Sequence, residues 1–82
     1  MNTTLWISYN PVKGAPFQPG ERVRVARVDD IEDAPYLGKA GTVTCLEYSN
    51  CRYRNFPHDP LIFVTFMGQP KREFWKEELE RI

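Results

Sequence analysis

The chain has 82 residues, a length that predicts one domain with a small core. Its hydrophobic content of 41% and aromatic content of 13% are typical of a folded protein rather than a disordered one. Eleven basic residues balance eleven acidic ones, which disfavours binding to nucleic acid through phosphates, because such proteins usually carry a basic excess. No stretch approaches the roughly 18 apolar residues of a membrane span, and no secretory signal pattern opens the chain. We therefore expect a cytoplasmic protein.

Residues 1–16 are expected to form an N-terminal arm, followed by one folded domain over residues 17–82. Within the arm, residues 5–9 have the composition of a short strand, and residues 10–16 form a connector rich in proline and glycine. Trp6 and Tyr9 are expected either to fold back onto the domain or to offer an aromatic contact to a partner.

The domain opens with a turn at Pro19-Gly20 and a strand over residues 21–28. Val23 and Val25 alternate there with Arg22 and Arg24, a period of two that predicts one buried and one exposed face. Residues 29–37 carry four acidic residues and Tyr36. We expect this segment to be a loop long enough to contact a partner.

The rest of the chain contains further short strands separated by turn residues. Gly38 and Gly41 bracket a predicted turn, and the next strand places Val43 and Cys45 on one face. In the most apolar strand, Ile62, Val64 and Phe66 are expected to point to the core. The predicted elements are strand 42–48, a polar loop over 49–59, strand 61–67, a turn over 68–70, strand 71–75, a 3₁₀ turn over 76–79 and a last strand over 80–82.

About five short strands within this length favour a small all-β barrel of the SH3-like type. Closing the sheet would remove exposed strand edges, which a strand as β-prone as residues 61–67 requires. We therefore predict a single closed SH3-like barrel with one 3₁₀ turn near the C-terminus.

The order of these features resembles the C-terminal SH3-like domain of nitrile hydratase β subunits over roughly residues 17–76. The resemblance implies the barrel fold and, as one alternative function, a subunit or relic of such an enzyme. Acidic residues stand before Pro35 where that family has basic ones, and no cysteine cluster matches the metal ligands of its α subunit. The matching positions are Phe17, Pro19-Gly20, Arg22-Val23-Arg24-Val25, Pro35-Tyr36, Gly38, Gly41-Thr42-Val43, Pro60-Leu61, Val64, Phe66 and Trp75.

Two further resemblances imply different functions. The stretch over residues 38–43, Gly-Lys-Ala-Gly-Thr-Val, is similar to the core of a KOW motif, which implies an RNA-binding domain as a second alternative. The whole layout is similar to small SH3-like accessory subunits of photosynthetic electron transfer, which implies a barrel that stabilises a complex or helps to dock an acidic ferredoxin.

The residues that carry catalytic and metal chemistry do not form a recognisable constellation. His58 and Asp59 are adjacent, and neighbouring side chains on an extended chain point apart. Cys45, Cys51 and His58 lack the close pairs of a structural zinc site. Cys45 is expected to be a buried hydrophobe, and Glu77 and Glu78 to be solvated in a surface turn. We predict no catalytic residue, no metal site, no cofactor and no enzyme activity.

The strongest candidate contact is the stretch Arg52-Tyr53-Arg54-Asn55-Phe56, because arginine and aromatic residues anchor protein interfaces. The alternative is that Tyr53 and Phe56 merely cap the barrel. We predict a non-catalytic protein-interaction module, an accessory subunit of a larger assembly, with a protein partner favoured over nucleic acid. The candidate partner-binding residues are Arg22, Arg24, Tyr36, Arg52, Tyr53, Arg54, Phe56, Lys71, Arg72 and Trp75.

Overall fold

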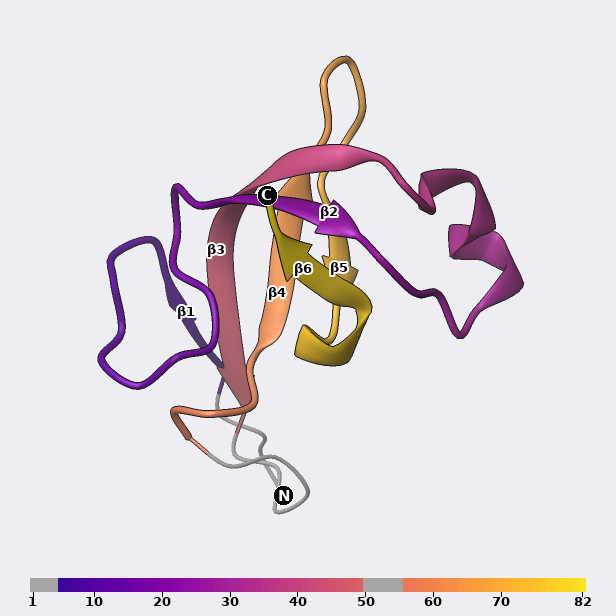
Figure 1. The fold of residues 1–82 in the computed structure, drawn as a ribbon. Coiled ribbons are helices and arrows are strands. Elements are labelled where there is room, and N and C mark those ends of the chain that lie inside the picture. The colour runs from indigo at the N-terminus through magenta and orange to yellow at the C-terminus, as the bar shows by residue number, and fades with distance from the viewer. Residues whose placement is uncertain (1–4, 50–55) are drawn as a thin grey trace.

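The structure, a computed structural model, describes residues 5–49 and 56–82. In this part of the chain it is an all-β protein with one six-stranded sheet and two 3₁₀ helices. The elements are β1 (Leu5–Ser8), β2 (Arg22–Val25), η1 (Ile31–Tyr36), β3 (Ala40–Ser49), β4 (Leu61–Thr65), β5 (Arg72–Phe74), η2 (Lys76–Glu78) and β6 (Leu79–Arg81) (Figure 1). None of the described helices is long and apolar enough to cross a membrane.

β3 is the longest strand and the centre of the sheet. It pairs antiparallel with β1, β2 and β4, and it curves strongly along its length (Figure 1). The register against β4 shifts between Val43 and Cys45, where the extra residue of a β-bulge bends a strand. The buried positions change parity there, so that Leu46 and Tyr48 are buried as well as Val43. The sequence predicted the inward Val43 but not this change of face.

The sheet is not closed, which corrects the closed barrel that the sequence predicted. The strand order is β5-β4-β3-β2-β6, with β1 on β3, and among the described residues no ladder joins β5 to β6. These end strands are consecutive in the chain and are linked by η2. The 3₁₀ turn η2 therefore connects β5 to β6 in the chain, without a hydrogen-bonded ladder between the two strands. The short strands and their order still fit an SH3-like fold.

The 3₁₀ turn predicted near the C-terminus forms as η2, whereas η1 was not predicted. Residues 29–37 were expected to be a plain loop, yet Ile31–Tyr36 is a 3₁₀ helix. The side chain of Asp30 caps it by accepting the N–H of Glu32 at 3.0 Å, and Pro35 inside it fixes one backbone angle. The chain then turns at Gly38, whose φ of 84° lies in the left-handed region that glycine favours.

The strand suggested over residues 5–9 forms as β1 and pairs with β3 from Leu5↔Ser49 to Ser8↔Leu46. Val12 and Phe17, on the connector that follows, are buried in the core. β1 therefore belongs to the same sheet as the later strands. The division of the chain into an arm and a domain at residue 17 stays a prediction.

The core lies inside the curved sheet. Val23 and Val64 have exposed fractions of 0%, and both face inward as predicted.

Gly41 lies within β3 rather than in the turn expected there, and a Cβ atom at this position would approach the Thr65 carbonyl oxygen to 2.7 Å. Cys45 is buried as predicted, and burial raises the pKa of its thiol. The remaining core side chains are Val12, Phe17, Val25, Val43, Leu46, Tyr48, Ile62, Phe66, Phe74 and Leu79.

Candidate protein-docking site

Residues 29–33, here called the acidic segment, leave β2 and enter η1. Four of the five residues are acidic, namely Asp29, Asp30, Glu32 and Asp33. The segment is fixed at its first residue, because the backbone N–H of Asp29 donates to the Glu78 carboxylate at 3.4 Å. η1 itself buries none of its residues fully, so residues 29–33 are held mainly by polar contacts.

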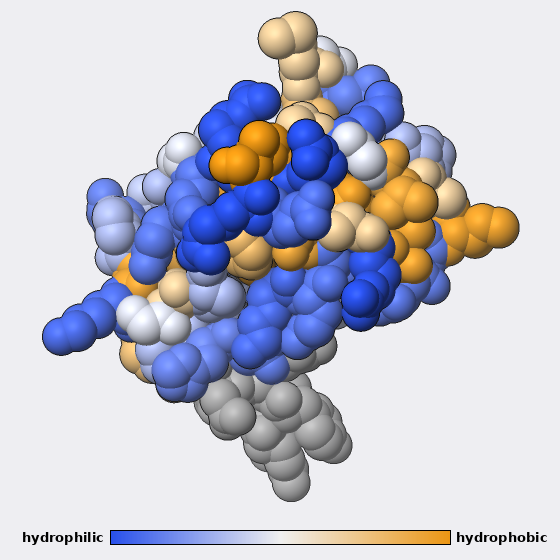
Figure 2. All heavy atoms as spheres, viewed as in Figure 1, coloured by the Kyte–Doolittle hydropathy of each residue, from blue (hydrophilic) through white to orange (hydrophobic). Residues whose placement is uncertain are grey.

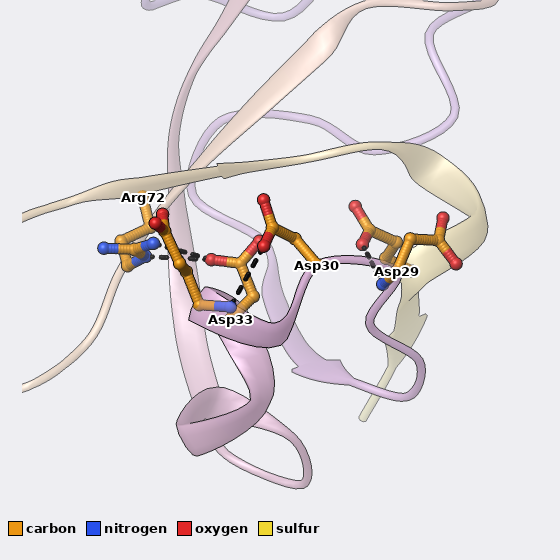
Figure 3. Close-up of polar contacts among 6 residues, drawn as sticks. Asp29, Asp30, Asp33 and Arg72 are labelled. Atoms are coloured by element: carbon orange, nitrogen blue, oxygen red, sulfur yellow. Dashed lines mark hydrogen bonds and ion pairs between the residues drawn. The ribbon is translucent and has the colours of Figure 1, made fainter.

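Arg72 of β5 fixes the other end of the acidic segment. Its Nη2 and Nε donate to Oδ1 of Asp33 at 2.7 and 3.2 Å (Figure 3). Its guanidinium lies 4.9 Å from the ring centroid of Tyr36, a cation–π distance. The hydrogen bonds that Arg72 donates to Asp33 raise the pKa of Arg72. Tyr36 packs in turn on Phe66, with ring centroids 5.0 Å apart, which joins the segment to the core.

A pocket of about 300 Å³ opens between the acidic segment and the region of β5 and η2. Six carboxylates and one guanidinium line it, together with an aliphatic and an indole side chain. Charges of one sign gathered in a concave site focus the potential there and attract the opposite charge. The lining residues are Asp29, Asp30, Glu32, Asp33, Leu61, Arg72, Glu73, Trp75 and Glu78.

Glu78 is buried, which corrects the expectation that it is solvated. Its exposed fraction is 5%, and its Oε1 accepts the N–H of Trp75 at 2.9 Å. Its backbone carbonyl also accepts the N–H groups of Ala26 and Arg27. Glu77, its neighbour on η2, is exposed as expected.

Three of the predicted binding residues meet at this pocket. Arg72 and Trp75 line it, and Tyr36 lies under the Arg72 guanidinium. Trp75 is half-buried. The guanidinium of Arg72 is engaged by Asp33, so within this site Arg72 holds the acidic segment instead of presenting a free positive charge.

The other predicted basic residues lie elsewhere. Arg22 is exposed on β2 and donates to Thr42 at 3.4 Å, and Arg24 lies 3.5 Å from Glu80. Lys71 precedes β5 and lies 5.3 Å from the Phe63 ring centroid. Because β3 and β4 separate β2 from β5 in the sheet, the structure does not gather these cations at the pocket.

Phe56 belongs to a separate aromatic cluster. Its ring centroid lies 5.5 Å from that of Trp6 and 4.8 Å from that of Tyr48, and 59% of it is exposed. Trp6 thus folds back onto the sheet, one of the two outcomes expected for it. The predicted residues Arg52, Tyr53 and Arg54, and also Cys51, lie outside the described residues.

Sequence reasoning singled out the loop over residues 29–37 but missed the opposite wall of the pocket. Leu61, Glu73 and Glu78 come from β4, β5 and η2, which only the tertiary structure brings to the acidic segment. One local signal was available for Glu78, because a glutamate three residues after the residue that starts a helical turn is placed to accept that residue's N–H.

The strand order, the short strands and the 3₁₀ turn before the last strand define an SH3-like domain. The whole of residues 2–82 matches the family described as the CarS bacterial SH3 domain. The chain belongs to this family. No curated protein and no solved structure matches the chain.

The family places the chain among protein-interaction modules, since SH3-type domains bind proteins and are generally non-catalytic. It supports the SH3-like part of the resemblances drawn from the sequence. The narrower resemblances to nitrile hydratase β subunits and to photosynthetic accessory subunits stay predictions.

Proposed function

We propose that this SH3 domain binds a basic segment of a protein partner in the pocket between the acidic segment and the β5–η2 region. The observation that carries the proposal is the gathering of six carboxylates, Leu61 and Trp75 around one pocket. The binding residues predicted from the sequence include several basic side chains, which would suit an acidic partner. The geometry favours the opposite polarity, because Arg72 is engaged by Asp33 and Arg24 lies near Glu80.

The composition of the pocket supports both attraction and contact area. Carboxylates steer a cationic partner and fix its orientation, while Leu61 and Trp75 add apolar area to the lining of the pocket. Hydrophobic side chains gather beside the acidic segment, over η1 (Figure 2), where Ile31 and Leu37 are exposed by 87% and 53%. These residues extend the polar pocket with apolar area, as interfaces commonly do.

An accessory role in a larger assembly is the form of this function that we favour. SH3-type domains generally recognise another protein and leave catalysis to it, and a pocket at one side of a small sheet suits that role. Binding of RNA through this pocket is disfavoured, since carboxylates repel phosphate groups.

The proposal is tested with a peptide of alternating arginine and glycine residues as the basic probe, titrated at low salt. The variant Asp29→Asn with Glu32→Gln removes two pocket charges, and within the described residues neither of these side chains makes a hydrogen bond or an ion pair. We expect about tenfold weaker binding, because two favourable charge interactions of roughly 0.7 kcal/mol each are lost.

The matched control is Glu77→Gln with Glu80→Gln, which removes the same charge outside the pocket. It should change the affinity by no more than about twofold, and raised salt should abolish most of the difference. Equal losses in the two double variants would show that only net charge matters, and would overturn the proposed site.

A further inference from the structure

Glu78 joins the two walls of the pocket. One of its carboxylate oxygens accepts the N–H of Trp75 at 2.9 Å. The other accepts the N–H of Asp29, labelled in Figure 3, at 3.4 Å. Asp29 begins the acidic segment, and Trp75 lines the opposite wall. A single side chain therefore spans the base of the pocket.

The chemistry of this contact requires a carboxylate at a fixed distance. Burying a carboxylate is costly unless it is well hydrogen-bonded, and Glu78 is 5% exposed. In the described part of the chain its side-chain partners are backbone N–H groups rather than a cationic side chain. The one property that a carboxylate adds here is that both of its oxygens accept, so that two backbone segments are held at once.

The backbone of Glu78 strengthens the same junction. Its carbonyl oxygen accepts the N–H groups of Ala26 at 2.8 Å and Arg27 at 3.2 Å, just before the acidic segment. Its own N–H donates to the carbonyl of Trp75 at 3.0 Å. Within residues 5–49 and 56–82, the hydrogen bonds of Glu78 thus connect η2 to the chain entering the acidic segment or to Trp75.

We propose that Glu78 is a positioning residue for the docking pocket, setting the spacing of the acidic segment and Trp75 without contacting the partner. This inference rests on the proposed function. It implies that occupancy of the pocket is coupled across Glu78, so that a ligand on one wall also orders the other.

Three variants distinguish the position of the Glu78 carboxylate from its negative charge. In Glu78→Gln one acceptor oxygen becomes an amide NH₂, which cannot accept a hydrogen bond, so one of the two N–H groups loses its partner. Glu78→Asp keeps the charge but is one methylene shorter, so it cannot span the same gap. Glu77→Gln is the matched control, because it removes the same charge from an exposed neighbour on the same turn.

The experiment is titration of the arginine–glycine probe into the full chain and into each variant. We expect about tenfold weaker binding for both Glu78→Gln and Glu78→Asp, as for loss of one hydrogen bond to a charged group, and a change within about twofold for Glu77→Gln. Wild-type affinity in Glu78→Asp would overturn the inference, as would equal effects of Glu78→Gln and Glu77→Gln. Failure of the wild-type chain to bind the probe would count instead against the proposed function.

Amide hydrogen exchange of the wild-type chain gives a second reading that does not depend on the variants folding. Addition of the probe should slow exchange of the Asp29 and Trp75 amides together. Slowing of the Asp29 amide with no change at Trp75 would contradict coupling through Glu78. Without the probe, the one amide that loses its acceptor should exchange faster in a folded Glu78→Gln variant, and both amides should exchange at the wild-type rate in Glu77→Gln.

Discussion

The core of the sheet and the acidic segment are held by different forces. Val23, Val64 and Leu46 are 0% exposed and are fixed by close packing. The acidic segment leads into η1, which buries none of its residues fully. Arg72 holds one end of the segment and Glu78 holds the other. The core needs only apolar side chains of suitable size, whereas the segment needs particular donors and acceptors.

This difference separates stability from recognition. Substitutions in the core should lower the free energy of unfolding and leave the affinity of the folded molecules unchanged. Substitutions in the segment should do the reverse. Variants of the core and of the segment test that separation.

Leu46→Ala should have the largest effect. It removes a fully buried side chain beside the bulge of β3, and such truncations cost about 2–5 kcal/mol. Urea unfolding measures the loss. A decrease below about 1 kcal/mol would show that the core at this strand is loosely packed. It would contradict the claim that close packing holds the core.

Gly41→Ala should destabilise the chain by about 1–3 kcal/mol through overpacking. The added Cβ would lie 2.7 Å from both the Thr65 carbonyl oxygen and Cγ1 of Val64. Gly68→Ala is not a neutral control because its φ is positive, so Ala40→Ser on the exposed neighbouring position serves instead. Thermal unfolding of the two variants should differ clearly, and equal midpoints would contradict the close approach.

Arg72→Met should lower the unfolding free energy by less than Gly41→Ala does, since it removes a partly exposed ion pair and a cation–π contact but keeps the apolar stem. Amide exchange over residues 29–33 should rise by more than exchange over β3. Arg22→Met, which loses only a 3.4 Å contact to Thr42, is the control. Similar exchange in both variants would mean that Arg72 does not hold the segment.

Asp29→Asn with Glu32→Gln should change the unfolding free energy by no more than about 0.5 kcal/mol, as is usual for surface substitutions without specific contacts. Urea unfolding of this variant accompanies its weakened binding to the basic probe. A large loss of stability would show that these carboxylates serve the fold, and recognition would no longer be separable from it.

The parts of the fold that follow a local pattern could be predicted from the sequence. The alternation of Val23 with Arg22 and of Val64 with its neighbours identified the inward faces, and a short turn was expected where η2 forms. The bulge in β3 could not be predicted, because it depends on the register against β4. η1 was missed because only part of what holds it is local. The cap at Asp30 is two residues from its partner, but Arg72, which binds Asp33, is 39 positions away.

Only one wall of the pocket, the acidic segment, could be predicted from the sequence. Acidic residues in succession indicate a charged surface loop, but nothing in the sequence places Leu61, Glu73 and Glu78 opposite it. Glu78 was misjudged because glutamates in a surface turn are usually solvated. Its burial follows from the backbone N–H of Asp29, a partner 49 positions away.

The most direct test of the docking site is a chemical-shift titration of the ¹⁵N-labelled chain with the arginine–glycine probe. The account predicts saturable shifts concentrated at the acidic segment and at residues 72–78, with small changes on β2. Shifts centred on Arg22, Arg24 or Phe56, with the amides of Asp29 and Trp75 unmoved, would contradict it.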